Sequence, residues 1–509
     1  MASRVETLES RLATPAVAPA SGWKRLLADW AVVGGAETVG QALGVVTSIL
    51  LRMLLSPAQM GVWQALKVFL NYANYANLGV SKGAARDYAV ALGRGDTAEA
   101  QRGLSLAHTV NTLSSLAFAL ALAGAAVWVG STGGPWAGTW AVGLVLVGGM
   151  AVVQRYVTFQ VTILRSKQAF WATSRVAVLE AVLTLTFCGL ATWLWGLAGL
   201  FLGTLAVMGG SLVYVHLCGA PWLGWAWDAK AIGRLIAVGS PILLAGTVAT
   251  LFRSLDKLMI LAYLPDREFQ LGCYSVALLV TTQLYGLGNM LSIVLGPRFG
   301  EKFGQTGSRP EVALLAARTT ELLAAAASLP AGLALVAAPP LLAALLPDYQ
   351  TGLAPLAWLV PGVVGLSLAL PAGQYLIAVD QQGRALAAVI VATVLAAVGN
   401  HLALTAGCGL AGVAAATGMA NAAFFVISAR VSLWGELSAL ERLRFVLMLA
   451  LAVAPVLGLA LAIECLWPSA PGNWAGMAAR MLTVTAAWGL SVALGWRYGG
   501  WGAMLRRRT

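Results

Sequence analysis

The chain has 509 residues, of which 59% are hydrophobic and only 10% are charged. This apolar fraction exceeds what a soluble core of this length can bury, so a soluble globular protein is excluded and lipid is the expected solvent. The net charge of +12 does not indicate a nucleic-acid partner, because the basic residues lie between apolar stretches rather than in one block.

Apolar stretches of about 20 residues recur from Ala31 to Trp496, and each is long enough to cross a hydrocarbon layer of about 30 Å as a helix. We predict an all-α integral membrane protein with about fourteen transmembrane helices. The predicted helices lie near residues 31–53, 61–80, 103–129, 137–163, 172–194, 197–217, 237–262, 270–296, 313–336, 354–378, 384–405, 409–429, 443–467 and 476–496.

The basic residues test this helix assignment, because cytoplasmic loops retain Lys and Arg whereas short translocated loops lose them. In the predicted order, most of the 32 basic residues fall on one side of the membrane, and the opposite connections hold Arg267. We therefore expect both termini in the cytoplasm. Residues 1–30 contain no signal peptide, so the first helix should act as its own insertion signal.

Two short sequence matches predict an internal repeat. Gly-Leu-Ala-Gly occurs at residues 196–199 and 409–412, while Gly61 and Gly272 open the second and eighth predicted helices. These landmarks are 213 and 211 residues apart, which places two six-helix lobes in the same orientation, with a substrate path between them. The predicted divisions are a cytoplasmic tail at 1–30, lobes at 31–218 and 219–440, and helices thirteen and fourteen with a basic tail at 441–509.

Polar side chains form stripes on several predicted membrane helices, most clearly on the first two. A charged group at mid-membrane depth costs at least about 2.5–3.5 kcal/mol, so such stripes should face the bundle interior or a hydrated cavity. The predicted lining residues are Glu37, Gln41, Gln64, Asn71, Asn74, Gln160 and Tyr285. The simpler alternative for the Asn residues is hydrogen bonding between helices.

Four cations within the predicted helices form the candidate substrate site: Arg52, Lys67, Arg155 and Arg253. They predict a cavity for an anion that cannot cross hydrocarbon unaided, and a pyrophosphate fits because Arg and Lys both bind phosphate oxygens. Asp256 paired with Arg253 or Lys257 is the structural alternative. The five cysteines have no metal-binding spacing, and neither a P-loop nor HExxH occurs, so no metal or cofactor is expected.

Loose motifs in a fixed order carry a family resemblance: residues 52–57 followed by 61–64, Gly239-Ser240-Pro241, Asp256-Lys257 before 271–277, and residues 346–349. From about Trp30 to Met448 the chain resembles the Wzx-type polysaccharide flippases, in the superfamily of MurJ and the MATE exporters. The resemblance implies alternating-access transfer of undecaprenyl-pyrophosphate-linked oligosaccharide to the periplasmic face of a bacterial inner membrane. It also implies membrane lipids, a polysaccharide polymerase and a chain-length regulator as partners.

A MurJ-like lipid II flippase and a MATE-like ion-coupled exporter remain open. Glu37 stands where the MATE resemblance would place an aspartate, and Glu37 and Asp256 are the candidates for ion coupling. The rival of another class is a membrane O-antigen polymerase or ligase, which would need a sizeable external loop. The predicted external connections are short and nearly uncharged, so no enzymatic activity is expected.

Overall fold

The computed structural model describes residues 22–81, 83–84, 87–88, 96–166, 169–467 and 473–498, and within these ranges the chain forms helices and no strand. Ten helical stretches are long and apolar enough to cross a membrane. One of them, Trp171–Leu217, bends at Gly196, where φ is +58°, and so contains two predicted helices. The protein is a multi-pass membrane protein.

The three remaining predicted helices lie on α2 (Gly22–Leu54), α3 (Pro57–Ala73) and α9 (Ala229–Tyr263). Each of these helices carries some of the polar residues predicted to face a cavity. For this reason they are less apolar than the ten spans. The first begins at Gly22 rather than near residue 31, so residues 22–30 are helical rather than tail. Residues 1–21 lie outside the described part of the chain.

Local signals fix several helix ends. Ser56 caps α3 in a capping box with Gln59, and Pro57 occupies its first turn, where the missing N–H costs nothing. The α3 helix ends at Ala73, before the predicted residue 80, and left-handed backbone follows at Leu78 and Gly79. Asp228 caps α9 through the backbone N–H groups of Ala231 and Lys230, and these bonds lower its pKa.

Helix packing repeats after six helices. The first half contains α2, α3, α5 (Thr97–Gly130), α6 (Ala137–Ser166), α7 (Phe170–Leu183) and α8 (Gly189–Leu217). The second contains α9, α10 (Arg267–Thr306), α11 (Arg309–Leu345), α12 (Leu356–Ala378), α13 (Gln382–Thr405) and α14 (Gly409–Ser432). The α5–α6, α6–α8, α7–α8 and α2–α7 contacts recur as α11–α12, α12–α14, α13–α14 and α9–α13. This correspondence supports the predicted pair of pseudo-symmetric lobes.

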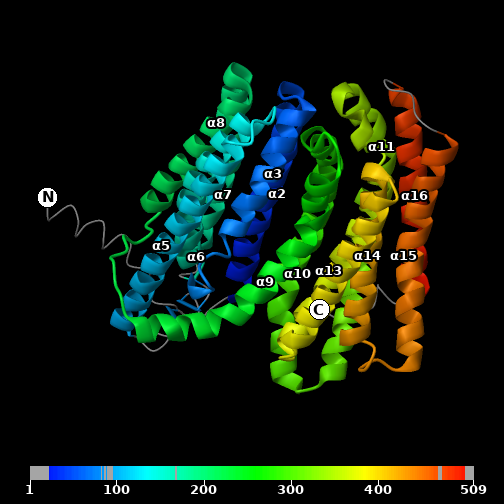
Figure 1. Ribbon diagram of the computed structural model, residues 1–509. Helices are drawn as coiled ribbons and strands as arrows, with labels where there is room; N and C mark the ends of the chain where they lie inside the picture. Colours follow the sequence, from blue (N-terminus) through cyan, green and yellow to red (C-terminus); the bar gives the residue numbers. More distant parts are fainter. Residues whose placement is uncertain are drawn as a thin grey trace.

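The last two helices, α15 (Ala439–Leu466) and α16 (Trp474–Tyr498), pack on α11 at the edge of the second half (Figure 1). The indole N–H of Trp488 donates to the carbonyl of Ala325 at 2.7 Å, and Arg444 contacts buried Glu321 at 3.5 Å. The α15 and α16 helices form the predicted appendage.

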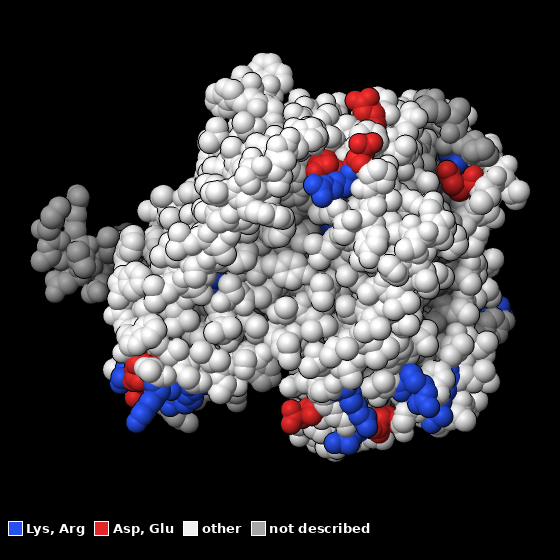
Figure 2. All heavy atoms as spheres, viewed as in Figure 1, with Lys and Arg blue, Asp and Glu red and all other residues white. Residues whose placement is uncertain are grey.

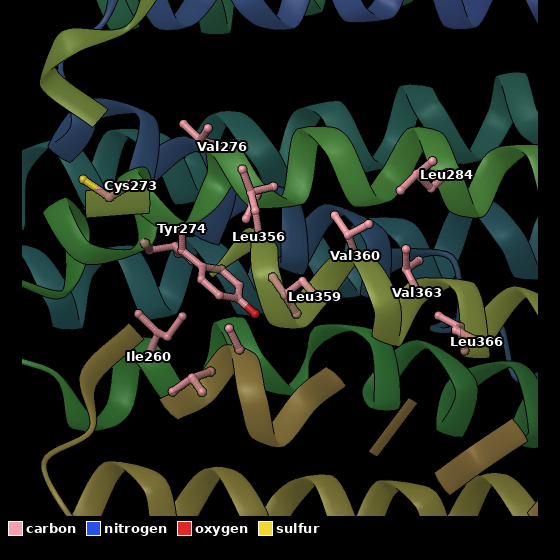
Figure 3. Close-up of a cluster of buried hydrophobic side chains, with 14 of the residues drawn as sticks. Ile260, Cys273, Tyr274, Val276, Leu284, Leu356, Leu359, Val360, Val363 and Leu366 are labelled. Carbon is pink, nitrogen blue, oxygen red and sulfur yellow. The ribbon is translucent and has the colours of Figure 1, made fainter. Parts of the chain in front are cut away.

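An apolar core fills the second half where α10 meets α12. Figure 3 shows Val276 and Leu284 of α10 facing Leu356, Val360 and Val363 of α12. Each of these side chains is at least nine-tenths buried. Packing of this density makes α10 and α12 a firm support for polar groups on the other face of α10.

Charged side chains gather at the two ends of the helical bundle and are sparse on the surface between them (Figure 2). We call the end with the α10–α11 and α12–α13 connections the basic end. Its exposed cations include Arg102, Lys230, Arg309 and Arg384. The opposite end, where α3 and α10 begin, carries exposed Asp266 and Asp348. A band with few surface charges between two charged ends is what a bilayer requires.

The two halves are in backbone contact at the opposite end. A Cβ atom on Gly61 of α3 would lie 1.7 Å from the carbonyl oxygen of Glu268, and one on Gly272 of α10 would lie 1.7 Å from that of Pro57. Only glycine permits this approach. Gly61 and Gly272 are also the repeat landmarks, so equivalent positions of the two halves meet each other.

A second glycine contact joins the halves nearer the basic end. A Cβ atom on Gly239 of α9 would lie 2.0 Å from the carbonyl oxygen of Gly79. The first turns of α9 pack under the first half, where Ile232 and Leu235 join a buried cluster with Val80 (Figure 1). The α9 helix of the second half therefore also packs against the first half.

Replacing Gly61 by alanine is expected to hold the opposite end open, because the new methyl group would meet the backbone of α10. Ser275 is fully buried behind this contact and can report its opening. An impermeant maleimide should modify Ser275→Cys several-fold faster in the Gly61→Ala protein. Gly124→Ala is the matched control, since its Cβ would have no neighbour within 4 Å. Equal rates in both variants would contradict the expected role of the contact.

Candidate functional site

The polar stripe of α3 lies on the face of the helix that the core leaves uncovered. Lys67, Asn71 and Asn74 are exposed and Gln64 is partly exposed, whereas Leu66 and Leu70 on the other faces are buried. A polar stripe exposed on a helix of the apolar band is expected to face a hydrated space rather than lipid.

The α9 helix supplies the facing cations, and α10 supplies a partner for one of them. The guanidinium of Arg253 is exposed, donates to the Tyr285 hydroxyl at 3.0 Å and to the Thr250 hydroxyl at 3.4 Å, and stacks on the Tyr285 ring at 5.6 Å. Lys257 follows one turn later and, with Arg52, lies within electrostatic range of Lys67. The structure thus brings Arg52, Lys67 and the α9 cations together between the halves.

Arg52 ties the end of α2 to α10. Its guanidinium donates to the Ser275 hydroxyl at 3.2 Å, to the Ser275 carbonyl at 2.8 Å and to the Ser48 carbonyl at 2.8 Å. Close by, the Tyr349 hydroxyl donates to the Leu55 carbonyl at 2.8 Å. Arg52 is therefore buried in the contact that closes the opposite end.

Asp256 is the described carboxylate of this region. It is buried, accepts a hydrogen bond from the Tyr274 hydroxyl at 2.9 Å and forms an ion pair with Lys257 at 3.3 Å. The Tyr274 ring lies within the apolar cluster of Figure 3. Of the two structural pairings considered for Asp256, the structure contains the one with Lys257.

Lys257 has a carboxylate partner, whereas Arg52, Lys67 and Arg253 have none within the described part of the chain. Arg52 and Arg253 donate to hydroxyl and carbonyl groups, and Lys67 makes neither an ion pair nor a hydrogen bond there. Among the described residues of this region, one carboxylate, Asp256, stands beside four cations. The described part of the region therefore has a net positive charge, which favours an anion as ligand.

Arg155 lies apart from this group, inside the first half. It is buried and donates to the Asn111 amide oxygen at 2.7 Å and to the Ser114 hydroxyl at 3.0 Å. One further buried nitrogen of its guanidinium has no hydrogen-bond partner among the described residues. Gln160 is also fully buried, with bonds to the Tyr156 hydroxyl and the Pro221 carbonyl. Neither residue lines the space between the halves in this structure.

The remaining predicted residues lie on α2. Gln41 is partly exposed beside α10, since a Cβ atom on Gly286 would lie 2.8 Å from its amide nitrogen. The side chain of Glu37 lies outside the described part of the structure. Sequence reasoning considered Lys257 as a partner of Asp256 and did not include it among the substrate-site cations. The structure places it within electrostatic range of Lys67.

The contacts rank the cations by structural importance. Arg52→Ala should lower the melting temperature of the purified protein by several degrees, because it removes three hydrogen bonds from a charged donor, two of them buried and each worth about 1.5–3 kcal/mol. Arg253→Ala should lower it much less, since Arg253 is exposed. Thermal unfolding of both variants measures the difference, and equal shifts would contradict the ranking.

Comparisons with known proteins agree with this architecture. A family model described as polysaccharide biosynthesis protein matches residues 49–348. No curated protein matches significantly. Among solved structures, the lipid II flippase MurJ in an inward closed conformation superposes with a TM-score of 0.67 at 12% identity, covering 91% of this chain and 98% of that one.

Two further structures share the fold. An inward-facing multidrug resistance MATE family transporter of the MOP superfamily gives a TM-score of 0.58 at 15% identity, covering 82% of this chain and 98% of that one. A MOP superfamily transporter from Pyrococcus furiosus gives 0.55 at 14% identity, covering 82% and 96%. At these identities the similarity shows the fold alone. Because the family model covers more than half of the sequence, the chain belongs to the polysaccharide biosynthesis protein family.

Proposed function

We propose that this protein is a flippase that moves undecaprenyl-pyrophosphate-linked oligosaccharide from the cytoplasmic to the periplasmic face of a bacterial inner membrane. The observation that carries the proposal is the cation group between the halves. Within the described chain, Arg52 and Arg253 donate only to hydroxyl and carbonyl groups, and Lys67 makes neither an ion pair nor a hydrogen bond. A pyrophosphate is an anion that such a group would hold and that lipid would not.

The two glycine contacts support an alternating-access mechanism. They place the backbones of the two halves in contact at both Gly61 and Gly239, so the halves can part at one contact while they stay joined at the other. The cations lie on helices that take part in these contacts. If Lys67 of the first half and Arg253 of the second both bind the cargo, rocking of the halves changes the distance between these two contacts.

Lipid II is the second candidate cargo, because the similarity to the MurJ structure extends over 91% of the chain. Both lipids carry a pyrophosphate, so the cation group would serve either. The proposal makes the protein a transporter rather than an enzyme, and no reaction is assigned to any residue. Asp256, with its Tyr274 and Lys257 partners, remains the described candidate for ion coupling.

Loss of charge at Arg253 should impair transport without unfolding the protein. Arg253→Gln is expected to lower export at least about tenfold, since a charge-assisted contact is worth about 1.5–3 kcal/mol, whereas Arg253→Lys should keep part of the activity. In cells whose only copy is Arg253→Gln, surface polysaccharide should fall and its lipid-linked precursor should accumulate. The chemical identity of that precursor distinguishes oligosaccharide units from lipid II.

Lys302→Gln is the matched control, because Lys302 lies at the basic end in a partly exposed ion pair with Glu311. It should leave export unchanged. Normal surface polysaccharide in Arg253→Gln cells that also lack Lys67 would contradict the anion-binding role. Membrane levels of each variant show whether a loss of export reflects a loss of protein.

We further propose that the basic end faces the cytoplasm, because short cytoplasmic connections retain Lys and Arg. Cysteines placed at Pro135 and Asp348 should then react with an impermeant maleimide in intact cells. A cysteine at Arg384 should react only after the membrane is permeabilised. Reaction of the Arg384→Cys protein in intact cells would reverse the orientation.

A further inference from the structure

A cavity of about 800 Å³ lies at the opposite end, between the α5–α6 connection and the α9–α10 connection. The first half contributes Trp136 and Trp140 to its walls, and the second contributes Asp266, Arg267 and Glu268. It is separate from the cation group, since none of Arg52, Lys67 and Arg253 lines it.

Two carboxylates of this cavity have acceptor capacity to spare. One oxygen of Glu268 accepts from the Trp140 indole at 2.9 Å and from Arg267 at 3.2 Å, while the other accepts no hydrogen bond within the described chain. Asp266 precedes α10 in a left-handed conformation, with φ of +46°, yet its exposed side chain does not cap the helix. Both groups can therefore accept hydrogen bonds from a ligand.

The walls fit a saccharide by their chemistry. A pyranose ring has a face of C–H groups that packs on an indole and a rim of hydroxyls that donate to carboxylates. Asp266 and Glu268 outnumber Arg267, so the cavity disfavours phosphate and differs in this from the cation group. Its volume is that of a site for a molecule of several rings rather than for an ion.

We propose that this cavity is a saccharide-binding site that exists only while the two halves are closed at the opposite end. Each half supplies one wall, and the Trp140–Glu268 hydrogen bond crosses between them. Glu268 also provides the carbonyl that meets Gly61. A saccharide bound here stabilises closure, because it binds the closed arrangement and has no complete site in the open one. The inference goes beyond the proposed function and does not depend on the cation group.

Titration calorimetry of the purified full-length protein with chitobiose, maltose and lactose tests the proposal. At least one disaccharide should bind, and Trp136→Ala and Asp266→Asn should each weaken its binding about tenfold or more. Asp266→Asn keeps the fold, since asparagine also adopts the left-handed conformation readily. Trp227→Ala, an exposed tryptophan of the α8–α9 connection, should leave the affinity unchanged.

Closure is tested with the glycine variants. The same disaccharide should bind more weakly to the Gly61→Ala protein than to the Gly124→Ala protein. Absence of binding by all three disaccharides, or equal binding to the wild-type and Asp266→Asn proteins, would overturn the site. Equal affinity in the two glycine variants, when Ser275→Cys reports opening in the first, would overturn its dependence on closure. Sodium phosphate should neither bind this cavity nor compete with the disaccharide.

Discussion

The cost of placing a charge in lipid governs the arrangement of this protein. Lys67 and Arg253 lie on helices that cross the apolar band of the molecule, and neither has a carboxylate partner within the described chain. Such groups are stable only where they face polar surroundings. The two halves meet this requirement by turning the polar faces of α3 and α9 toward each other, so that lipid contacts the apolar faces of the outer helices.

The same arrangement explains why glycine occurs at both contacts. Cations that face each other repel, and a space between them has to stay open to water or cargo. Backbone approach at Gly61 and Gly272, and at Gly79 and Gly239, brings the halves together at two places without bulky side chains. Hydrogen bonds of Tyr72 with the Ser254 hydroxyl and of Tyr75 with the Thr250 hydroxyl also join the first half to α9.

Sequence reasoning identified the fourteen helical segments, because an apolar stretch of this length has few alternatives. Helical periodicity also placed Lys67, Asn71 and Asn74 on one uncovered face. Periodicity does not say which helix covers a polar face, and for that reason Arg155 and Gln160, predicted in the cavity, lie inside the first half. The repeat marked Gly61 and Gly272 as equivalent, but only the structure shows that they touch.

The ion pair of Asp256 with Lys257 neutralises part of the positive charge of the cation group. Lys67 is within electrostatic range of Arg52 and Lys257, so bringing the halves together brings like charges together. An anion between them removes that repulsion and favours closure around itself, whereas an empty site favours separation. The ion pair of Asp256 with Lys257 offsets part of this repulsion. Under the proposed function, the charges of this group connect the affinity for the anionic cargo to the distance between the halves, which is the coupling that alternating access needs.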